Sequence, residues 1–219
     1  MFKSFYFQFL HCIRKIDLLA IYIGCALMCN MLTLEHEKIY ATKFISEGDF
    51  STKLIINHKI IHDNIHEQLT LSNYACKIID TKWFQRLRYL EQLGLCSRIW
   101  PCANHTRFSH SIGTYYTTGL FLKAIMENSD VKHIEECLIK IKELKDSFGE
   151  VPYLSDRICE LIKISGLCHD LGHGPFSHVF DDIILKDCKS PLARHEVRSC
   201  IILEKIIEER KIPITKNDT

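Results

Sequence analysis

The sequence predicts a mainly helical domain with a small β-hairpin on its N-terminal side. Three segments, 107–126, 131–148 and 155–167, repeat apolar residues at the three-to-four-residue spacing of amphipathic helices. Ahead of them, short β-branched runs between Lys53 and Leu71 are broken by Asn and Asp, which is typical of strands joined by turns. The chain has 219 residues, of which 47% are hydrophobic and 25% charged, so we expect one main domain.

The overall composition narrows the class of protein. A formal net charge of +1 argues against nucleic acid as the main ligand, although local Arg and Lys can still bind a phosphorylated molecule. The 11 cysteines include no C-x-x-C pair and lie mostly within apolar helical patterns, which indicates buried, reduced thiols. Reduced thiols predict a nuclear or cytoplasmic protein.

Residues 1–52 are expected to form an apolar leader and a linker. The first residues are rich in Phe, and the run from Leu18 to Leu34 carries no charge. Such a segment is a signal peptide, a signal anchor in a membrane, or a buried or spurious extension, and the residues alone leave these alternatives open. Positions 35–51 are mixed and polar, as in a linker, and residues 211–219 form a polar tail.

The strand region contains apolar runs at 54–56, 59–61 and 68–71. Three histidines in this region recur every four residues: His58, His62 and His66. On a helix this spacing makes a metal-binding stripe, but residues four apart also share one face of a strand. The β-branched neighbours favour a hairpin with a polar edge over a metal site.

The segment after the hairpin predicts one helix from Lys82 to Gly94. Asp80 or Thr81 can cap its start, and Gly94 can end it. The polar face of this helix carries Gln85, Arg88 and Gln92. Such a face is solvated unless it binds a ligand.

The next predicted helix carries Arg107 and His110 in its first turn, before a long apolar pattern. A lone histidine there is more typical of a hydrogen-bonded core residue than of a ligand. A buried guanidinium, however, needs an anion, and the first backbone N–H groups of a helix also bind anions. The two residues together therefore predict a phosphate site.

The stretch from Gly166 to His178 contains three histidines and one aspartate. The adjacent pair His169-Asp170 places an imidazole nitrogen beside a carboxylate oxygen, which suits a divalent metal. Glycines and a proline at 172–175 interrupt the helical pattern, so the following imidazoles can bend around a cavity.

Three motifs, taken in order, resemble the HD-domain phosphohydrolases. They are Arg107-Phe-x-His110-Ser-x-Gly113, the stretch 166–178, and His195-Glu196 at the start of the last helical pattern. Residues 78–94 resemble the branch of this family that combines a SAM domain with an HD domain and hydrolyses deoxynucleoside triphosphates. The resemblance covers 53–210 and implies a partial, truncated HD helical bundle with a β-hairpin on its N-terminal side.

This resemblance implies a deoxynucleoside triphosphate triphosphohydrolase, which splits a dNTP such as dGTP into a deoxynucleoside and triphosphate. The divalent metal, Zn, Fe, Mn or Mg, would be bound by His110, His169 and Asp170. The residues implied to bind substrate are Gln92, Leu93, Arg107, His173 and His178. The residues implied to act in catalysis are His195, His178 and Asp181, a histidine giving a proton to the leaving 5′-oxygen and the aspartate orienting it.

The family also binds GTP or a dNTP as an allosteric activator at a subunit interface, which implies a nucleotide-bridged homo-oligomer. The residues that match this site are Lys59, Asp80, Gln85 and Arg88. Where the family pattern runs Asn-Asp-Pro-Ile-His-Gly, this chain has His62-Asp-Asn-Ile-His-Glu67, and the loss of Pro and Gly alters the turn. The fourth metal ligand of the family, an aspartate on a later helix, lies beyond the last residue here. We therefore expect three protein ligands and an open side.

Three functional hypotheses follow from these residues. The first is a dNTP triphosphohydrolase that contributes to dNTP catabolism. The second is another HD phosphohydrolase, acting on a nucleotide monoester or diester, which the polar helix at 82–94 disfavours. The third is a catalytically impaired HD fragment that binds nucleotide or regulates a full-length relative, and the missing fourth carboxylate favours it.

Overall fold

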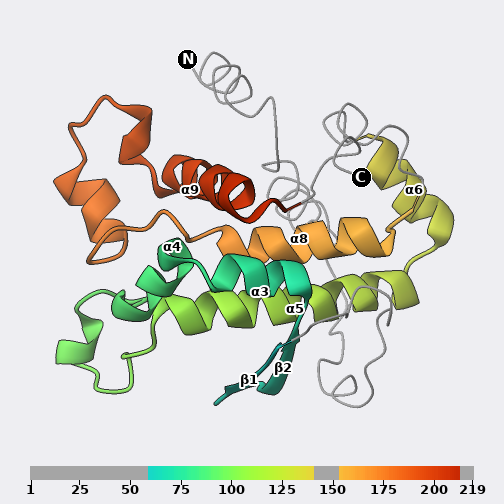
Figure 1. Cartoon of the computed structure of the whole chain (residues 1–219), viewed down its shortest axis with the longest axis horizontal. Helices are drawn as coiled ribbons and strands as arrows, with labels where there is room; N and C mark the ends of the chain where they lie inside the picture. Colours follow the sequence, from blue (N-terminus) through green and yellow to red (C-terminus); the bar gives the residue numbers. More distant parts are fainter. Residues whose placement is uncertain (1–58, 141–152, 213–219) are drawn as a thin grey trace.

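The structure is a computed structural model that describes residues 59–140 and 153–212 (Figure 1). Within these ranges the chain is mostly helical with one two-stranded antiparallel sheet, as the sequence predicts. The main elements are β1 (Lys59–Asp63), β2 (Glu67–Leu71), α3 (Asn73–Ile79), α4 (Lys82–Gln85), α5 (Arg107–Asn128), α6 (Val131–Ile139), α8 (Asp156–Cys168) and α9 (His195–Arg210). Short helical turns are η1 (Arg86–Tyr89), η2 (Cys96–Arg98), η3 (Phe180–Ile184) and η4 (Pro191–Ala193).

Several expected features lie outside the described residues. They are the leader and linker, the strand at 54–56, His58, the later part of the helix expected at 131–148, and most of the polar tail. In the part of the chain that the structure does describe, no helix combines the length and apolar character needed to cross a bilayer.

The predicted hairpin is confirmed. Strands β1 and β2 pair antiparallel, from Lys59 opposite Leu71 to Asp63 opposite Glu67. The Asp63 carboxylate accepts hydrogen bonds from the backbone N–H groups of Ile65 (3.1 Å) and His66 (3.0 Å), which closes the turn without the Pro and Gly of the family pattern. Of the three histidines, the structure describes two: His62 Nε2 lies 3.4 Å from the Gln68 side-chain nitrogen, and the His66 ring packs against Tyr116, 5.1 Å between centroids.

The prediction of a single helix from Lys82 to Gly94 is wrong. Helix α4 ends at Gln85, η1 follows, and the backbone is extended at Leu90. Leu90 leaves the helix because its carbonyl accepts the N–H of Arg107 (2.8 Å), while the N–H of Gln92 donates to the His105 carbonyl (3.0 Å). Residues 85, 88 and 92 therefore do not share one helical face.

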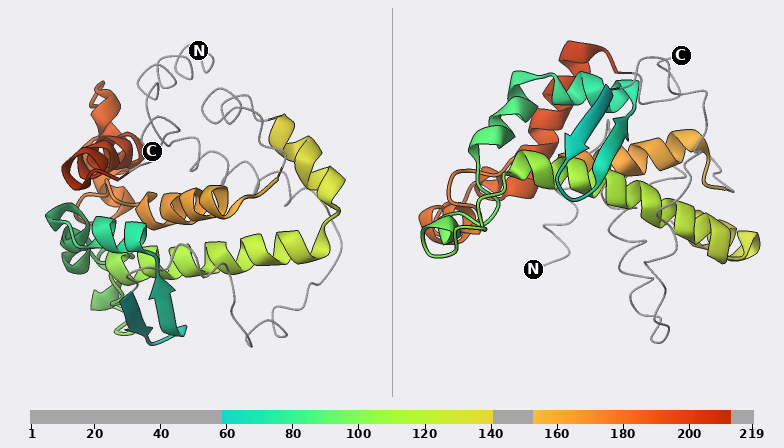
Figure 2. Two further views of the ribbon diagram at one scale, coloured as in Figure 1. Left: turned by 45° about the vertical axis from the view of Figure 1, so that its right-hand side comes forward. Right: turned by 90° about the horizontal axis from the view of Figure 1, so that it is seen from below.

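Helices α5 and α8 run side by side through the centre of the domain, and α3 contacts both α8 and α9 (Figures 1 and 2). Side-chain oxygens cap the helices: Thr106 accepts from the N–H of Ser109 at the start of α5 (3.4 Å), and Ser155 accepts from Ile158 at the start of α8 (3.3 Å). The core is formed by apolar side chains of all these elements, among them Leu71, Ile78, Phe84, Leu87, Ile112, Leu167, Leu171, Leu203 and Ile206. This antiparallel pair brings the first turn of α5 and the last turn of α8 to the same side of the domain (Figure 1).

One buried carboxylate ties three elements together. Glu160 of α8 is 7% exposed and accepts hydrogen bonds from Tyr115 Oη of α5 (2.9 Å), from Lys163 Nζ (2.9 Å) and from the Ser72 hydroxyl ahead of α3. A buried charge needs such partners to be tolerated. The network therefore stabilises the packing of α5 against α8 away from the histidines.

Candidate metal centre

Two histidines and one aspartate converge where α5 begins and α8 ends. Their ligand atoms all lie within 4.8 Å of one another. The His110 Nε2 and His169 Nε2 atoms are 3.3 Å apart, and Asp170 places one carboxylate oxygen 3.4 Å from His110 Nε2 and the other 3.3 Å from His169 Nε2. Two nitrogens and a carboxylate facing one point form a donor set that suits a divalent transition metal.

The protonation of these side chains also fits a cation. Burial, and then the neighbouring His169, lower the pKa of His110, which keeps its ring neutral near neutral pH. His169 Nδ1 lies 2.7 Å from the Gly166 carbonyl, so this nitrogen carries the proton and Nε2 presents a lone pair. Burial opposes ionisation of Asp170, but the rings of His169 and His173, whose Nε2 atoms lie 3.3 and 3.4 Å from its Oδ1, hold the pKa of Asp170 well below its ordinary value. The ionised Asp170 raises the pKa of His169 against the effect of burial, so a proton and a metal ion compete for that ring.

Arg107 lies directly behind Asp170. The side chain is 1% exposed, its Nη1 donates to Asp170 (2.5 Å) and its Nη2 donates to the Ser177 hydroxyl (2.6 Å). Ser177 in turn donates to the Gln92 carbonyl (3.0 Å) and, like Phe176, has positive φ. The guanidinium compensates the buried carboxylate. Its predicted contact with a substrate phosphate stays a prediction, since both terminal nitrogens already bind protein groups.

A second cluster of three histidines adjoins this centre. The rings of His173 and His195 stack at 3.8 Å, and His178 stands edge-on to both, at 4.9 and 5.4 Å. His173 is 1% exposed, its Nε2 lies 3.4 Å from Asp170 Oδ1 without hydrogen-bond geometry, and its Nδ1 has no hydrogen-bond partner within residues 59–140 and 153–212. One ligand nitrogen of each ring lies within 4.8 Å of the others, as in the first cluster, but this set has no carboxylate. We therefore assign the metal to the first cluster, and these imidazoles are suited to proton transfer.

Asp181 orients one ring of this cluster. Its carboxylate oxygen Oδ2 accepts hydrogen bonds from the backbone N–H of His195 (2.8 Å) and from His195 Nδ1 (2.7 Å). Burial opposes ionisation, but the bonds from Arg198 and His195 lower the pKa of Asp181. An ionised carboxylate at Nδ1 leaves His195 Nε2 as the nitrogen that can exchange a proton with a ligand.

Residues 107–216, half of the chain, match the HD domain family. The chain belongs to the HD domain family. It is 43% identical over 167 residues to a putative HD domain-containing protein of Acanthamoeba polyphaga mimivirus, covering 73% of this chain and 33% of that protein. It is also similar to two proteins named deoxynucleoside triphosphate triphosphohydrolase SAMHD1 or its homolog. The Dictyostelium discoideum homolog is 35% identical over 188 residues (85% of this chain, 32% of the relative), and the human protein is 41% identical over 140 residues (64% and 18%). The chain thus spans a third or less of the length of these relatives.

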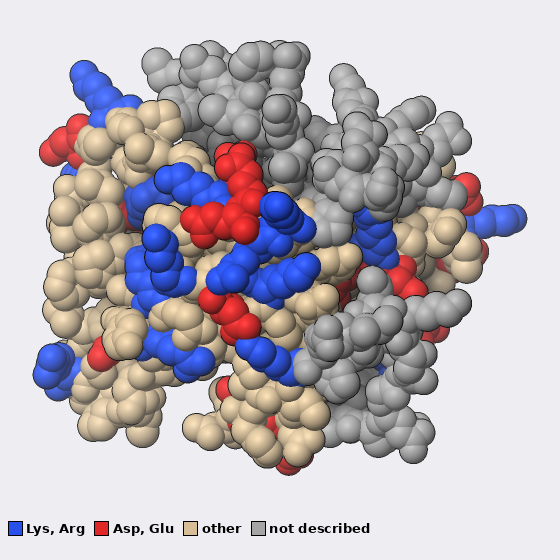
Figure 3. Space-filling model, viewed as in Figure 1, with Lys and Arg blue, Asp and Glu red and all other residues tan. Residues whose placement is uncertain are grey.

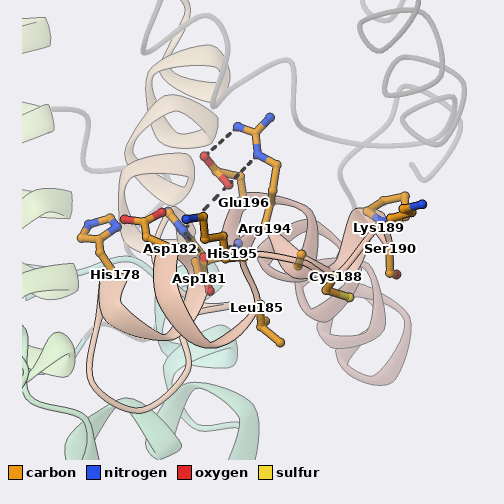
Figure 4. A pocket seen from close by; sticks show the side chains of 13 residues that line it. His178, Asp181, Asp182, Leu185, Cys188, Lys189, Ser190, Arg194, His195 and Glu196 are labelled. Atoms are coloured by element: carbon orange, nitrogen blue, oxygen red, sulfur yellow. Dashed lines mark hydrogen bonds and ion pairs between the residues drawn. The ribbon is translucent and has the colours of Figure 1, made fainter.

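A pocket of about 690 Å³ opens beside the second histidine cluster of the HD domain (Figure 4). His178, Asp181 and His195 lie together at one end of this pocket, and Lys189 and Ser190 lie at the other. Its lining includes two rings of the second cluster, His178 and His195, and none of the three candidate metal ligands.

The two residues predicted to contact the nucleoside, Gln92 and Leu93, precede the range that matches the HD family and differ in exposure. Gln92 lies next to Arg107 through the Ser177 bridge, and its side-chain oxygen is buried without a hydrogen-bond partner in the described part of the chain. Leu93 is 47% exposed. A nucleoside contact by either residue stays a prediction.

Four residues are predicted to bind a second, activating nucleotide, and in the structure they contact one another in two pairs. Lys59 of β1 forms an ion pair with Asp80 after α3, and both side chains are about half exposed. Arg88 Nε donates to the Gln85 side-chain oxygen (2.7 Å), and its guanidinium lies 3.5 Å from the Phe108 ring centroid. The predicted binding of a nucleotide by these four residues would have to replace these contacts, and it stays a prediction.

Sequence reasoning missed the groups that hold the loop of the HD motif. We define this loop, residues 169–177, as the HD loop. Arg86 donates to the carbonyls of His173 (2.8 Å) and Leu171 (2.7 Å), and Arg198 donates to that of Gly172 (2.8 Å). Ser199 bridges the Gly172 N–H and the His169 carbonyl, each at 2.8 Å. No local pattern predicts them, because every one of these contacts joins distant segments.

Proposed function

We propose that this chain is a metal-dependent deoxynucleoside triphosphate triphosphohydrolase. The observation that carries the proposal is the convergence of His110, His169 and Asp170 beside a separate cluster of three imidazoles. The first cluster has the donor atoms for a divalent cation, and the second has the proton-transfer groups that a leaving alkoxide needs. The names of the Dictyostelium and human relatives support a dNTP as the substrate.

Each side chain has a distinct task in this proposal. The divalent cation supplies neutralisation of phosphate charge and activation of water when it is bound. The His195 ring takes up a second proton at Nε2 from solvent and donates it to the leaving 5′-oxygen, while its Nδ1–H stays bound to Asp181. His178, edge-on to that ring, is the alternative proton donor. Arg107 and His173 bind phosphate oxygens, and Gln92 and Leu93 contact the nucleoside.

The direct test is hydrolysis by the purified chain. Incubation with dGTP and Mn²⁺ or Fe²⁺ should release triphosphate and deoxyguanosine in equal amounts, separated by ion-exchange chromatography. His169→Ala should abolish release, and His133→Ala should not, because His133 is an exposed histidine of α6 outside both clusters. Release of orthophosphate or pyrophosphate in place of triphosphate would indicate the other class of HD phosphohydrolase and contradict the proposal.

A second candidate function is nucleotide binding without turnover, as a regulatory partner. The observation that favours it is that the four residues matching the second-nucleotide site gather in one place, since Gln85 Nε2 donates to the Ile79 carbonyl next to Asp80 (2.8 Å) and Gln85 also accepts from Arg88. Calorimetry with GTP and with dGTP, on wild type and on Lys59→Gln, separates the two functions. Saturable binding that depends on Lys59 without any triphosphate release supports the regulatory function, and sedimentation with nucleotide tests a nucleotide-bridged homo-oligomer.

The mixed surface agrees with a small-molecule substrate. Basic and acidic side chains are interspersed over the visible face of the described residues, without a single-sign stripe (Figure 3). Such a face does not favour nucleic acid as the main ligand. A nuclear or cytoplasmic location remains part of the proposal, to be tested by imaging a tagged chain.

A further inference from the structure

Arg198 of α9 connects three separate segments around the second histidine cluster. Its Nε donates to the Gly172 carbonyl of the HD loop (2.8 Å), and its Nη1 donates to the Leu192 and Ala193 carbonyls of η4 (2.6 and 2.8 Å). Its Nη2 donates to Asp181 Oδ1. The side chain is 18% exposed. Few other side chains can make such contacts, because only a guanidinium carries five donors in a rigid plane.

The contact with Asp181 acts on His195. Arg198 donates a hydrogen bond to Oδ1 of the Asp181 carboxylate, and the backbone N–H and Nδ1 of His195 donate to its Oδ2. The carboxylate is therefore held from both sides and cannot rotate to offer its second oxygen elsewhere. This orientation fixes Nδ1 as the protonated nitrogen of the neutral His195 ring, so a second proton, the one that the ring can pass on, binds at Nε2.

The contact with Gly172 acts on His173. The N–H of Gly172 donates to Ser199 Oγ and its carbonyl accepts from Arg198, so adjacent residues of α9 hold both polar groups of one peptide position. The approach is so close that a Cβ at position 172 would lie 2.3 Å from the His195 carbonyl oxygen. The loop is thus pressed against α9 at the point where His173 stacks on His195.

We propose that Arg198 is a positioning residue that sets the tautomer of His195 through Asp181 and its stacking on His173 through Gly172. The catalytic consequence rests on the proposed function, in which His195 donates the proton. The effect of Arg198 on the His195 ring does not depend on the proposed function, because it concerns only contacts within the folded chain. Arg198 touches neither the metal ligands nor, in the proposed reaction, the substrate.

The test compares Arg198→Gln and Arg198→Lys with wild type. A matched control is Lys205→Gln, which removes an exposed positive charge two turns further along α9, over the Trp83 ring. Long-range ¹H–¹⁵N spectra of the ¹⁵N-histidine-labelled chain, with assignment by His195→Gln, report which nitrogen of the neutral ring carries the proton. Steady-state kinetics with dGTP report kcat and KM separately.

We expect wild type and Lys205→Gln to show His195 protonated at Nδ1. Arg198→Gln should show a mixture of both tautomers and a kcat lower by about 10–100-fold, the usual effect of removing a group that orients a functional imidazole, with KM unchanged. Arg198→Lys keeps the positive charge but loses the planar set of donors, so its tautomer mixture and its kcat should lie between those of wild type and Arg198→Gln.

Persistence of the Nδ1–H tautomer in Arg198→Gln overturns the proposal, whatever the rate. If the tautomer changes but kcat does not, the claim that Arg198 supports catalysis through His195 is overturned. If wild type releases no triphosphate, the proposed function fails and the spectra alone decide the role of Arg198. If circular dichroism shows that Arg198→Gln is unfolded, Arg198→Lys decides by the same two readouts.

Discussion

Adding one methyl group at Gly172 should separate the HD loop from α9. A Cβ built at this position lies 2.3 Å from the His195 carbonyl oxygen and 2.3 Å from the Ser199 nitrogen. Ordinary contacts of a Cβ are 3.4–4 Å. Both obstructing atoms belong to the backbone of one helix, so no side-chain rotation relieves the clash, and α9 must withdraw.

The size of the effect follows from that displacement. Restoring an ordinary contact requires a shift of about 1 Å, and a misplacement of this size in a catalytic group can reduce activity by about 100-fold. Overpacking of this kind typically destabilises a protein by about 1–3 kcal/mol. At about 2–4 °C per kcal/mol for a chain of this length, Gly172→Ala should lower Tm measurably without preventing folding.

Gly119→Ala is the matched control. Position 119 lies within α5, where a Cβ meets only the Lys163 side chain, at ordinary contact distances of 3.4 and 3.6 Å. Alanine there should stabilise the helix by up to about 1 kcal/mol. Differential scanning fluorimetry and the triphosphate-release assay compare both variants with wild type. Wild-type Tm and activity in Gly172→Ala would refute the close packing of the HD loop on α9.

Other predictions concern the rest of the described chain. Glu160→Ala leaves the Lys163 ammonium and two hydroxyls without their buried acceptor, so urea unfolding should show a loss of about 3–5 kcal/mol. The exposed pair of Glu127 with Lys123 should contribute at most about 0.5 kcal/mol when Glu127 is replaced by Ala. The pKa of Asp181 is lowered from 3.8, so its stabilisation is present above that value and is lost as pH falls through the folded-state pKa. The stability difference between wild type and Asp181→Asn should therefore be larger at about pH 6 than at about pH 3, and equal differences would contradict this. Burial raises the pKa of Cys159 to about 11 and that of Cys200 to about 12, so peptide mapping after iodoacetamide at neutral pH should find both unmodified while the exposed Cys102 and Cys188 react.

Local patterns predicted much of the fold. The helix expected from Arg107 corresponds to α5, and Ser155 caps α8 as expected, because apolar periodicity and capping are properties of neighbouring residues. The failure at Lys82–Gly94 has a different cause. Strong helical periodicity there is overridden at Leu90 by backbone pairing with Arg107, a contact that the local sequence does not reveal.

The candidate site likewise has features that are local in the sequence and features that depend on long-range contacts. By itself the sequence determined which chemical groups are present: the His169-Asp170 pair, the histidines around it, and the glycines that let the chain turn, since these are local in the chain. The family resemblance implied that His110, 59 positions away, meets His169, and the structure places their Nε2 atoms 3.3 Å apart. Only the tertiary structure decided that Asp181 belongs to His195. It also decided the place of Arg198, whose chemical type suggests nothing until packing brings a carboxylate and three carbonyls around it. The physical reason is that these side chains are positioned by the antiparallel packing of α5 on α8 and by the docking of α9 on the HD loop, which are long-range contacts.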